Sequence, residues 1–149
     1  MPAYDSWDPR RSEHGAFVLR VALGAMFIAH ALLKLFVFTL PGTAQFFGSL
    51  GLPPWLGYVT FAGELVGGVL LVLGIHTRYV AAAMIPILLG AAWAHAGNGW
   101  VFSAPNGGWE YPAFLAVASF VQVLLGAGAW ALRPSSLGAL QRGATVASA

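Results

Sequence analysis

Four long apolar stretches, separated by short polar or turn-forming segments, dominate the hydrophobic pattern of the chain. They cover about residues 16–38, 56–74, 79–96 and 112–132. Each approaches the roughly 20 residues that a helix needs to cross the hydrocarbon of a bilayer. The runs are continuous rather than alternating, which disfavours membrane-spanning strands. The pattern therefore predicts an all-α integral membrane protein built as a four-helix bundle.

The composition supports a single membrane domain. Of the 149 residues, 58% are hydrophobic and only 8% are charged, whereas about a quarter of a soluble domain is charged. We expect a cytoplasmic N-terminal segment at residues 1–15, a transmembrane domain at residues 16–133, and a flexible cytoplasmic tail at residues 134–149. The first segment lacks the short apolar core and cleavage site of a secretory signal, so the first span should be retained as an anchor.

The basic residues predict the orientation of the spans. Arg10 and Arg11 precede the first stretch, Arg78 lies between the second and third, and Arg133 and Arg142 follow the fourth. The other two connections contain no Lys or Arg. By the positive-inside rule, both termini should lie in the cytoplasm.

Two classes of function are disfavoured by charge and composition. The net charge is +2, but the basic residues are scattered, and a nucleic-acid partner would require a clustered basic face. The chain contains no cysteine, which excludes disulfides and thiolate chemistry within it.

Ionisable residues inside the spans are the candidate functional groups, because a charge within the bilayer is costly and normally faces the bundle interior. They are His30 and Lys34 in the first span, Glu64 in the second, His95 near the end of the third, and Glu110 at the mouth of the fourth. His30 and Glu64 should both lie about 12 Å below the outer boundary, at about 1.5 Å per residue. Lys34 should sit one turn higher, closer to His95 and Glu110. This predicts a polar pocket in the outer half of the bundle, able to bind a ligand or handle protons.

Other interpretations of the same residues stay open. Lys34 could extend to the outer headgroups, His30 could be a neutral hydrogen-bonded core residue, and His95 could be interfacial. Arg20 lies one turn from the cytoplasmic edge, where it would anchor to lipid phosphates. A metal bound by His30, Glu64 and His95 is a weak hypothesis, because no short-spaced ligand pair exists, and we predict no metal site.

Glycines beside Glu64 predict close helix packing. The string AGELVGG places Gly63, Gly67 and Gly68 on the second span, and small residues at such spacing let membrane helices approach closely. They are more typical of packing than of a cofactor-binding loop.

Three motifs resemble the DoxX family of small four-helix bacterial membrane proteins. These are HALLKLF in the first span, GELVGGVLLVLGIHTR across the end of the second, and NGGWEYP before the fourth, and the resemblance covers about residues 18–132. It implies a multi-pass protein of the bacterial inner membrane. The family takes its name from the small subunit of an archaeal thiosulfate:quinone oxidoreductase, and other members are described as membrane partners of redox enzymes. The resemblance places the following residues at motif positions: His30, Lys34, Glu64, Arg78, His95, Trp109 and Glu110.

The residues and the resemblance together favour a redox-associated membrane subunit that binds a quinone-like molecule. The sequence shows no flavin, haem or iron–sulfur motif, so we do not expect catalysis by this chain alone. The alternatives are a non-catalytic scaffold and a small proton-coupled carrier. Besides the lipid bilayer, the expected partners are a redox protein or a second copy of the chain. The identity of the ligand and the oligomeric state stay open.

Overall fold

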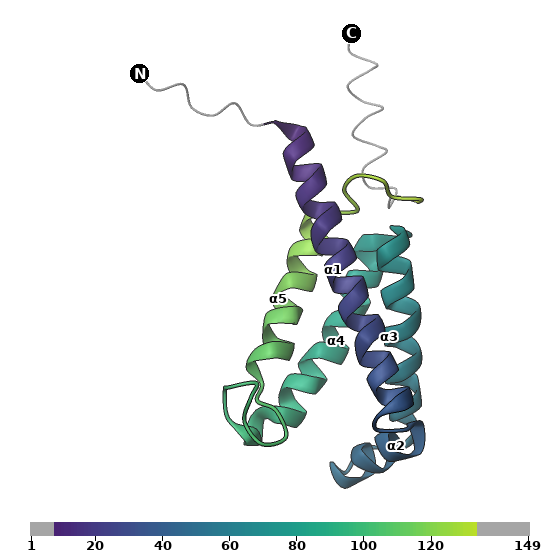
Figure 1. The fold of residues 1–149 in the computed structure, drawn as a ribbon, viewed down its shortest axis with the longest axis vertical. Coiled ribbons are helices and arrows are strands. Elements are labelled where there is room, and N and C mark those ends of the chain that lie inside the picture. The colour runs from purple at the N-terminus through teal and green to yellow at the C-terminus, as the bar shows by residue number, and fades with distance from the viewer. Residues whose placement is uncertain (1–7, 134–149) are drawn as a thin grey trace.

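The computed structural model describes residues 8–133, in which helices are joined by loops (Figure 1). The elements are α1 (Pro9–Phe36), α2 (Leu40–Ser49), α3 (Trp55–Leu73), α4 (Thr77–His95), the short 3-10 helix η1 (Ala96–Asn98) and α5 (Glu110–Leu125). Within this range no strand forms, and the prediction of an all-α fold is confirmed. α1, α3 and α4 are long and apolar enough to cross a membrane, whereas α5 is a shorter apolar helix.

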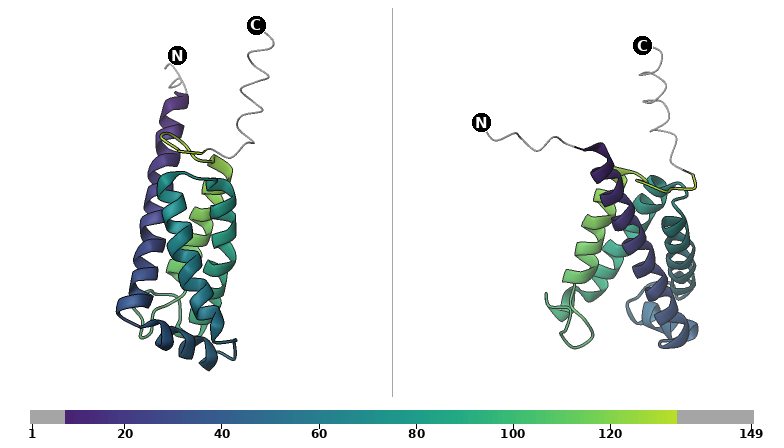
Figure 2. Two further views of the ribbon diagram at one scale, coloured as in Figure 1. Left: turned by 90° about the vertical axis from the view of Figure 1, so that its right-hand side faces the viewer. Right: turned by 45° about the horizontal axis from the view of Figure 1, so that its top comes forward.

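The helices are arranged as two pairs. α1 packs along α3, and α4 packs along α5, with smaller contacts joining the pairs. The pairs converge at the end where the described chain begins and finishes, and diverge toward the end that carries α2 and the α4–α5 loop (Figures 1 and 2). We call the first of these the strap end, after residues 126–133, which cross it, and the second the loop end.

Local signals in the sequence explain where the long helices begin and end. The Asp8 carboxylate accepts a hydrogen bond of 3.0 Å from the backbone N–H of Arg10, and Pro9 occupies the first turn of α1. An acidic cap followed by proline is a strong helix start. α3 ends at Gly74, which adopts the left-handed conformation with φ 71° that glycine tolerates best.

The helix α2 is the main departure from the four helices that we predicted. Thr39 caps it by accepting a 3.1 Å hydrogen bond from the N–H of Gly42. Pro41 is accommodated because it lies in the first turn, where no N–H is needed. α2 packs closely on α3, since a Cβ on Gly57 would lie 3.1 Å from the Ala44 nitrogen. The expected count of four helices was therefore wrong, because tertiary packing outweighs the weak helix propensity of this glycine- and proline-containing segment.

A segment after α5 closes the strap end. Our fourth apolar stretch reached residue 132, but α5 ends at Leu125 because Gly126 and Gly128 both have positive φ. Residues 126–133, which we call the strap, then cross the end of the bundle. Its backbone bonds to α1 through Ala129 N–H to Glu13 O at 3.0 Å, and to the α3–α4 link through Arg133 N–H to Gly74 O at 3.1 Å. Residues 1–7 and the predicted tail at residues 134–149 lie outside the described range.

Two glycines set the approach of α1 to α3. A Cβ on Gly24 would lie 2.7 Å from the Gly68 carbonyl oxygen, and a Cβ on Gly68 would lie 2.8 Å from the Gly24 carbonyl oxygen. Gly67 faces α4 instead, where a Cβ would lie 2.7 Å from the Met84 sulfur, and Gly63 faces Ile87. Close backbone contact and dispersion between helices are the forces that assemble membrane bundles. The core beside these contacts contains Leu23, Phe27, Leu71, Ala81, Met84, Leu88, Leu115, Ala116 and Ala118.

Candidate functional site

An ion pair joins α1 to α3 in the loop-end half of the bundle. The Lys34 ammonium lies 2.9 Å from Oε1 and 2.7 Å from Oε2 of Glu64, and the two side chains are only 17% and 9% exposed. A charged hydrogen bond of this length, made to both carboxylate oxygens, compensates each ion for its loss of water.

Lys34 pairs with the acid that lies at the depth of His30, although its own Cα is one turn further along α1. We expected Lys34 to sit one turn above His30 and Glu64, closer to His95 and Glu110, and to form one wall of a polar pocket opposite Glu64. Side chains on a helix tilt toward its N-terminus, so the long lysine side chain reaches back to the level of Glu64.

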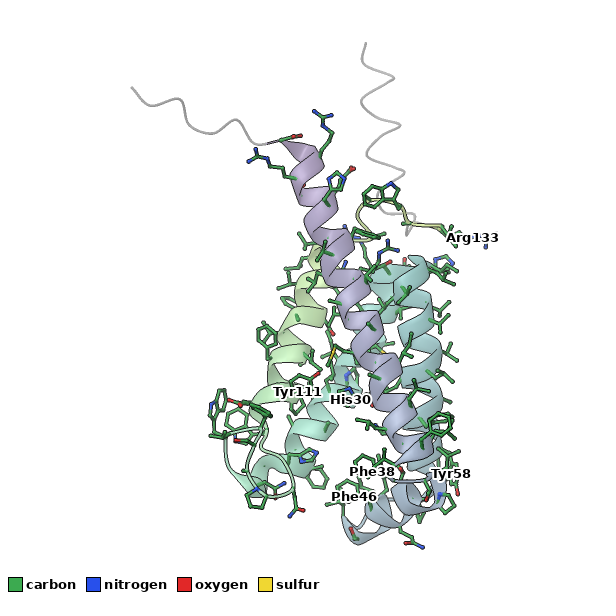
Figure 3. The ribbon with its side chains drawn as sticks, viewed as in Figure 1. His30, Phe38, Phe46, Tyr58, Tyr111 and Arg133 are labelled. Atoms are coloured by element: carbon green, nitrogen blue, oxygen red, sulfur yellow. The ribbon has the colours of Figure 1, made fainter. Side chains whose placement is uncertain are left out.

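His30 connects this ion pair to the second helix pair. Its Nδ1 lies 2.8 Å from the Met26 carbonyl oxygen, which can only accept, so Nδ1 carries the proton and Nε2 of the neutral ring is an acceptor. The His30 ring stacks on Tyr111 of α5, with ring centroids 5.6 Å apart and an interplanar angle of 25° (Figure 3).

Tyr111 completes the group that we call the loop-end cluster: His30, Lys34, Glu64 and Tyr111. Its hydroxyl is buried and has no hydrogen-bond partner within residues 8–133. Such a group normally has a partner, since leaving it unpaired costs about 1–3 kcal/mol. Sequence reasoning missed Tyr111, because an aromatic residue beside the mouth of a span is typical of an interfacial belt.

An aromatic hollow lies next to the cluster and shares Tyr111 with it. The hollow has a volume of about 490 Å³ and lies between α5 and the α4–α5 loop, a size typical of small-molecule sites. Trp100 and Trp109 stand edge to face in its wall, with centroids 4.5 Å apart. The remaining lining residues are Phe102, Glu110, Ala113, Phe114 and Val117.

His95 and Glu110, which we expected in the polar pocket, bind the α4–α5 loop instead. His95 Nδ1 lies 3.0 Å from the Asn106 carbonyl oxygen and 3.1 Å from that of Gly107. Glu110 Oε1 accepts a 2.8 Å hydrogen bond from the Phe102 N–H. Glu110 therefore lines the hollow, whereas His95 holds the α4–α5 loop at Asn106 and Gly107.

The residues that we named for packing lie at both ends of the bundle. Arg78 donates a 2.6 Å hydrogen bond to the Val123 carbonyl oxygen and thereby fixes the start of α4 against the end of α5. Trp109 belongs to the hollow. Within residues 8–133, no three His, Cys, Asp or Glu side chains gather closely enough to hold a metal ion, so His30, Glu64 and His95 do not form such a group.

This geometry defines an all-helical membrane protein with a polar cluster between helices α1, α3 and α5. The chain belongs to the DoxX family, whose model matches residues 15–97. The match contains the HALLKLF and GELVGGVLLVLGIHTR motifs and ends before NGGWEYP.

A curated relative is the putative oxidoreductase CatD of Bacillus subtilis (strain 168), which is 46% identical over 79 residues. The aligned part covers 53% of this chain and 58% of CatD, so the chain spans less than two thirds of that relative. No solved structure gives a significant match.

Proposed function

We propose that this protein is a redox-associated membrane subunit whose loop-end cluster binds the head group of a quinone-like molecule. The observation that carries the proposal is the convergence of four polar side chains, one of them the unpartnered Tyr111 hydroxyl, beside an aromatic hollow. Membership of the DoxX family and the oxidoreductase name of CatD support a redox setting.

The cluster offers the groups that a quinone head requires. A quinone carbonyl accepts hydrogen bonds, and the Tyr111 hydroxyl and the Lys34 ammonium are donors. Reduction to the quinol takes two electrons and two protons. In this proposal the electrons come from a redox partner protein, and the protons pass through the Glu64 carboxylate and His30 Nε2.

The hollow would bind the ring of the quinone, while the hydrocarbon tail of the quinone would extend into the lipid. Its aromatic walls, Trp100, Trp109 and Phe114, suit the flat face of a quinone. Tyr111 lines the hollow and also stacks on His30, so a ring in the hollow lies next to the proton-handling groups.

We place the cluster in the outer half of the bacterial inner membrane, with α1, α3, α4 and α5 as spans and both termini cytoplasmic. Support comes from the basic residues: Arg10, Arg78 and Arg133 belong to the strap end, and the loop-end connections contain neither Lys nor Arg.

Because the sequence contains no cysteine, introduced cysteines can test this orientation directly. An impermeant maleimide should label Ser103→Cys in intact cells and Glu13→Cys only after permeabilisation, and the reverse pattern would refute this orientation.

A scaffold function is the second candidate, and the Lys34–Glu64 pair favours it. A buried ion pair can fix helix register without any ligand. In that case the protein would recruit a redox partner or a second copy of itself through its surface.

Thermal denaturation in detergent distinguishes the two functions. A ligand that binds only the folded state raises the melting temperature. Once the ligand concentration exceeds Kd, the rise grows with the logarithm of that concentration. With short-chain ubiquinone and menaquinone, we expect a dose-dependent rise in melting temperature for the wild type. No rise with either quinone would reject the quinone site and favour the scaffold.

A further inference from the structure

The aromatic hollow contains one side chain that is charged at neutral pH. Among the described residues that line the hollow, this is Glu110, and the others are aromatic or aliphatic. The roles proposed above for Tyr111 and Lys34 do not involve this carboxylate. A carboxylate in an otherwise aromatic wall affects which ligand the hollow accepts.

The α4–α5 loop holds the Glu110 carboxylate in place. Its Oε1 accepts the 2.8 Å hydrogen bond from the Phe102 N–H, and the Glu110 N–H donates to the Trp100 carbonyl oxygen at 3.1 Å. The N–H of Trp109 donates to the Gly99 carbonyl oxygen, also at 3.1 Å. Both the side chain and the backbone are thus fixed to the loop, so a ligand in the hollow meets a preorganised carboxylate.

The second oxygen of this carboxylate is available to a ligand. Glu110 Oε2 makes no hydrogen bond or ion pair within residues 8–133. Residues 79–132 contain neither Lys nor Arg, and His95 bonds to carbonyl oxygens of the loop. Because an ionised carboxylate can only accept hydrogen bonds, the ligand that satisfies Oε2 must carry a donor.

The two redox states of a quinone differ in this respect. Both oxygens of the oxidised ring are carbonyls that only accept, whereas the reduced ring, the quinol, has two O–H groups that donate. A quinone carbonyl that faces the carboxylate is repelled by it, but a quinol hydroxyl donates a charge-assisted hydrogen bond to it. The two oxygens of a para-quinone lie at opposite ends of the ring, so one can face the loop-end cluster while the other faces Glu110.

We propose that Glu110 makes the aromatic hollow selective for the quinol over the quinone. This inference rests on the proposed function, because it assigns the redox state of the ligand that the same site takes. The quinol should bind about tenfold more tightly, since hydrogen bonds to charged groups are strong. By linkage, preferential binding of the reduced form also makes the bound quinone easier to reduce, which suits a site that receives electrons from a partner protein.

Isothermal titration calorimetry in detergent under nitrogen, with decylubiquinone and decylubiquinol as probes, tests the preference. For the wild type, we expect a Kd about tenfold lower for the quinol. Glu110→Gln keeps an oxygen that can accept the Phe102 N–H and replaces Oε2 by an NH2 donor. In this variant the Kd of the quinol should rise, and the Kd of the quinone should fall because the amide donates to its carbonyl. Loosening of the loop would instead weaken the binding of both.

Glu13→Gln, which neutralises an exposed carboxylate at the strap end, is the matched control and should keep the wild-type preference. Equal Kd values in the wild type, or tighter binding of the quinone, would overturn this inference and leave the proposed function standing. A Glu110→Gln variant that keeps the tenfold preference, or that binds both rings more weakly by the same factor, would also overturn it. If neither ring bound, the proposed function would fail and this inference with it.

Discussion

At the scale of single residues, the Lys34–Glu64 pair is the contact that organises the proposed site. Helix depth alone predicted a buried acid opposite His30 and Lys34, but it placed Lys34 one turn above the acid to which its ammonium binds. Depth arithmetic follows Cα positions, whereas a lysine side chain extends about one turn toward the N-terminus of its helix. Tyr111 was missed for a different reason, since its partner His30 comes from a helix distant in sequence.

The ion pair also makes a thermodynamic prediction. Lys34→Met leaves a buried carboxylate without its partner and should lower the free energy of unfolding by about 3 kcal/mol. Adding Glu64→Gln removes that charge, so the double variant should regain at least half of the loss. Unfolding in a sodium dodecyl sulfate titration, followed by circular dichroism, measures both values. If Lys34→Met alone were neutral, the pair would not compensate a buried charge.

At the scale of helices, continuous apolar runs identified every long helix of the fold. The same criterion could not find α2, whose residues resemble a turn and become helical through capping by Thr39 and packing of Ala44 on Gly57. It also extended the fourth apolar stretch past α5, because hydropathy does not register the positive φ of Gly126 and Gly128. The pattern of apolar residues predicts which segments are buried in lipid or protein, but it does not predict the backbone conformation of each residue.

The close packing of α1 on α3 depends on Gly24 and Gly68. Gly68→Ala puts a methyl group 2.8 Å from the Gly24 carbonyl oxygen, a backbone atom that cannot move without shifting the helix. We expect a loss of about 1–3 kcal/mol in the free energy of unfolding. Gly90→Ala in α4 is the matched control, because nothing lies within 4 Å of the added carbon, and it should stabilise by about 0.5–1 kcal/mol. The same detergent titration tests both, and equal effects would contradict the close α1–α3 contact.

At the scale of the whole molecule, the two helix pairs divide the polar groups between opposite ends. His30 and Tyr111 of the loop-end cluster lie where the pairs diverge (Figure 3). The buried side chains of Arg20 and Gln122 belong to the half where the pairs converge, since they bond to the strap and to α1. Between them the core is apolar, with Phe27, Met84 and Leu115 among its residues. The proposed quinone site therefore belongs to the loop-end half of the fold.

The affinity of a short-chain quinone for the Tyr111→Phe variant tests the central claim most directly. Trp100 and Trp109 line the hollow, so quenching of tryptophan fluorescence should report binding in detergent. Tyr111→Phe keeps the ring that stacks on His30 and removes only the unpartnered hydroxyl, so folding should be unaffected. We predict that Kd rises about fivefold to tenfold, the effect of one lost hydrogen bond, while Tyr79→Phe at the strap end binds like the wild type. An unchanged Kd for Tyr111→Phe, or no saturable quenching of the wild type, would contradict a quinone site at the loop-end cluster.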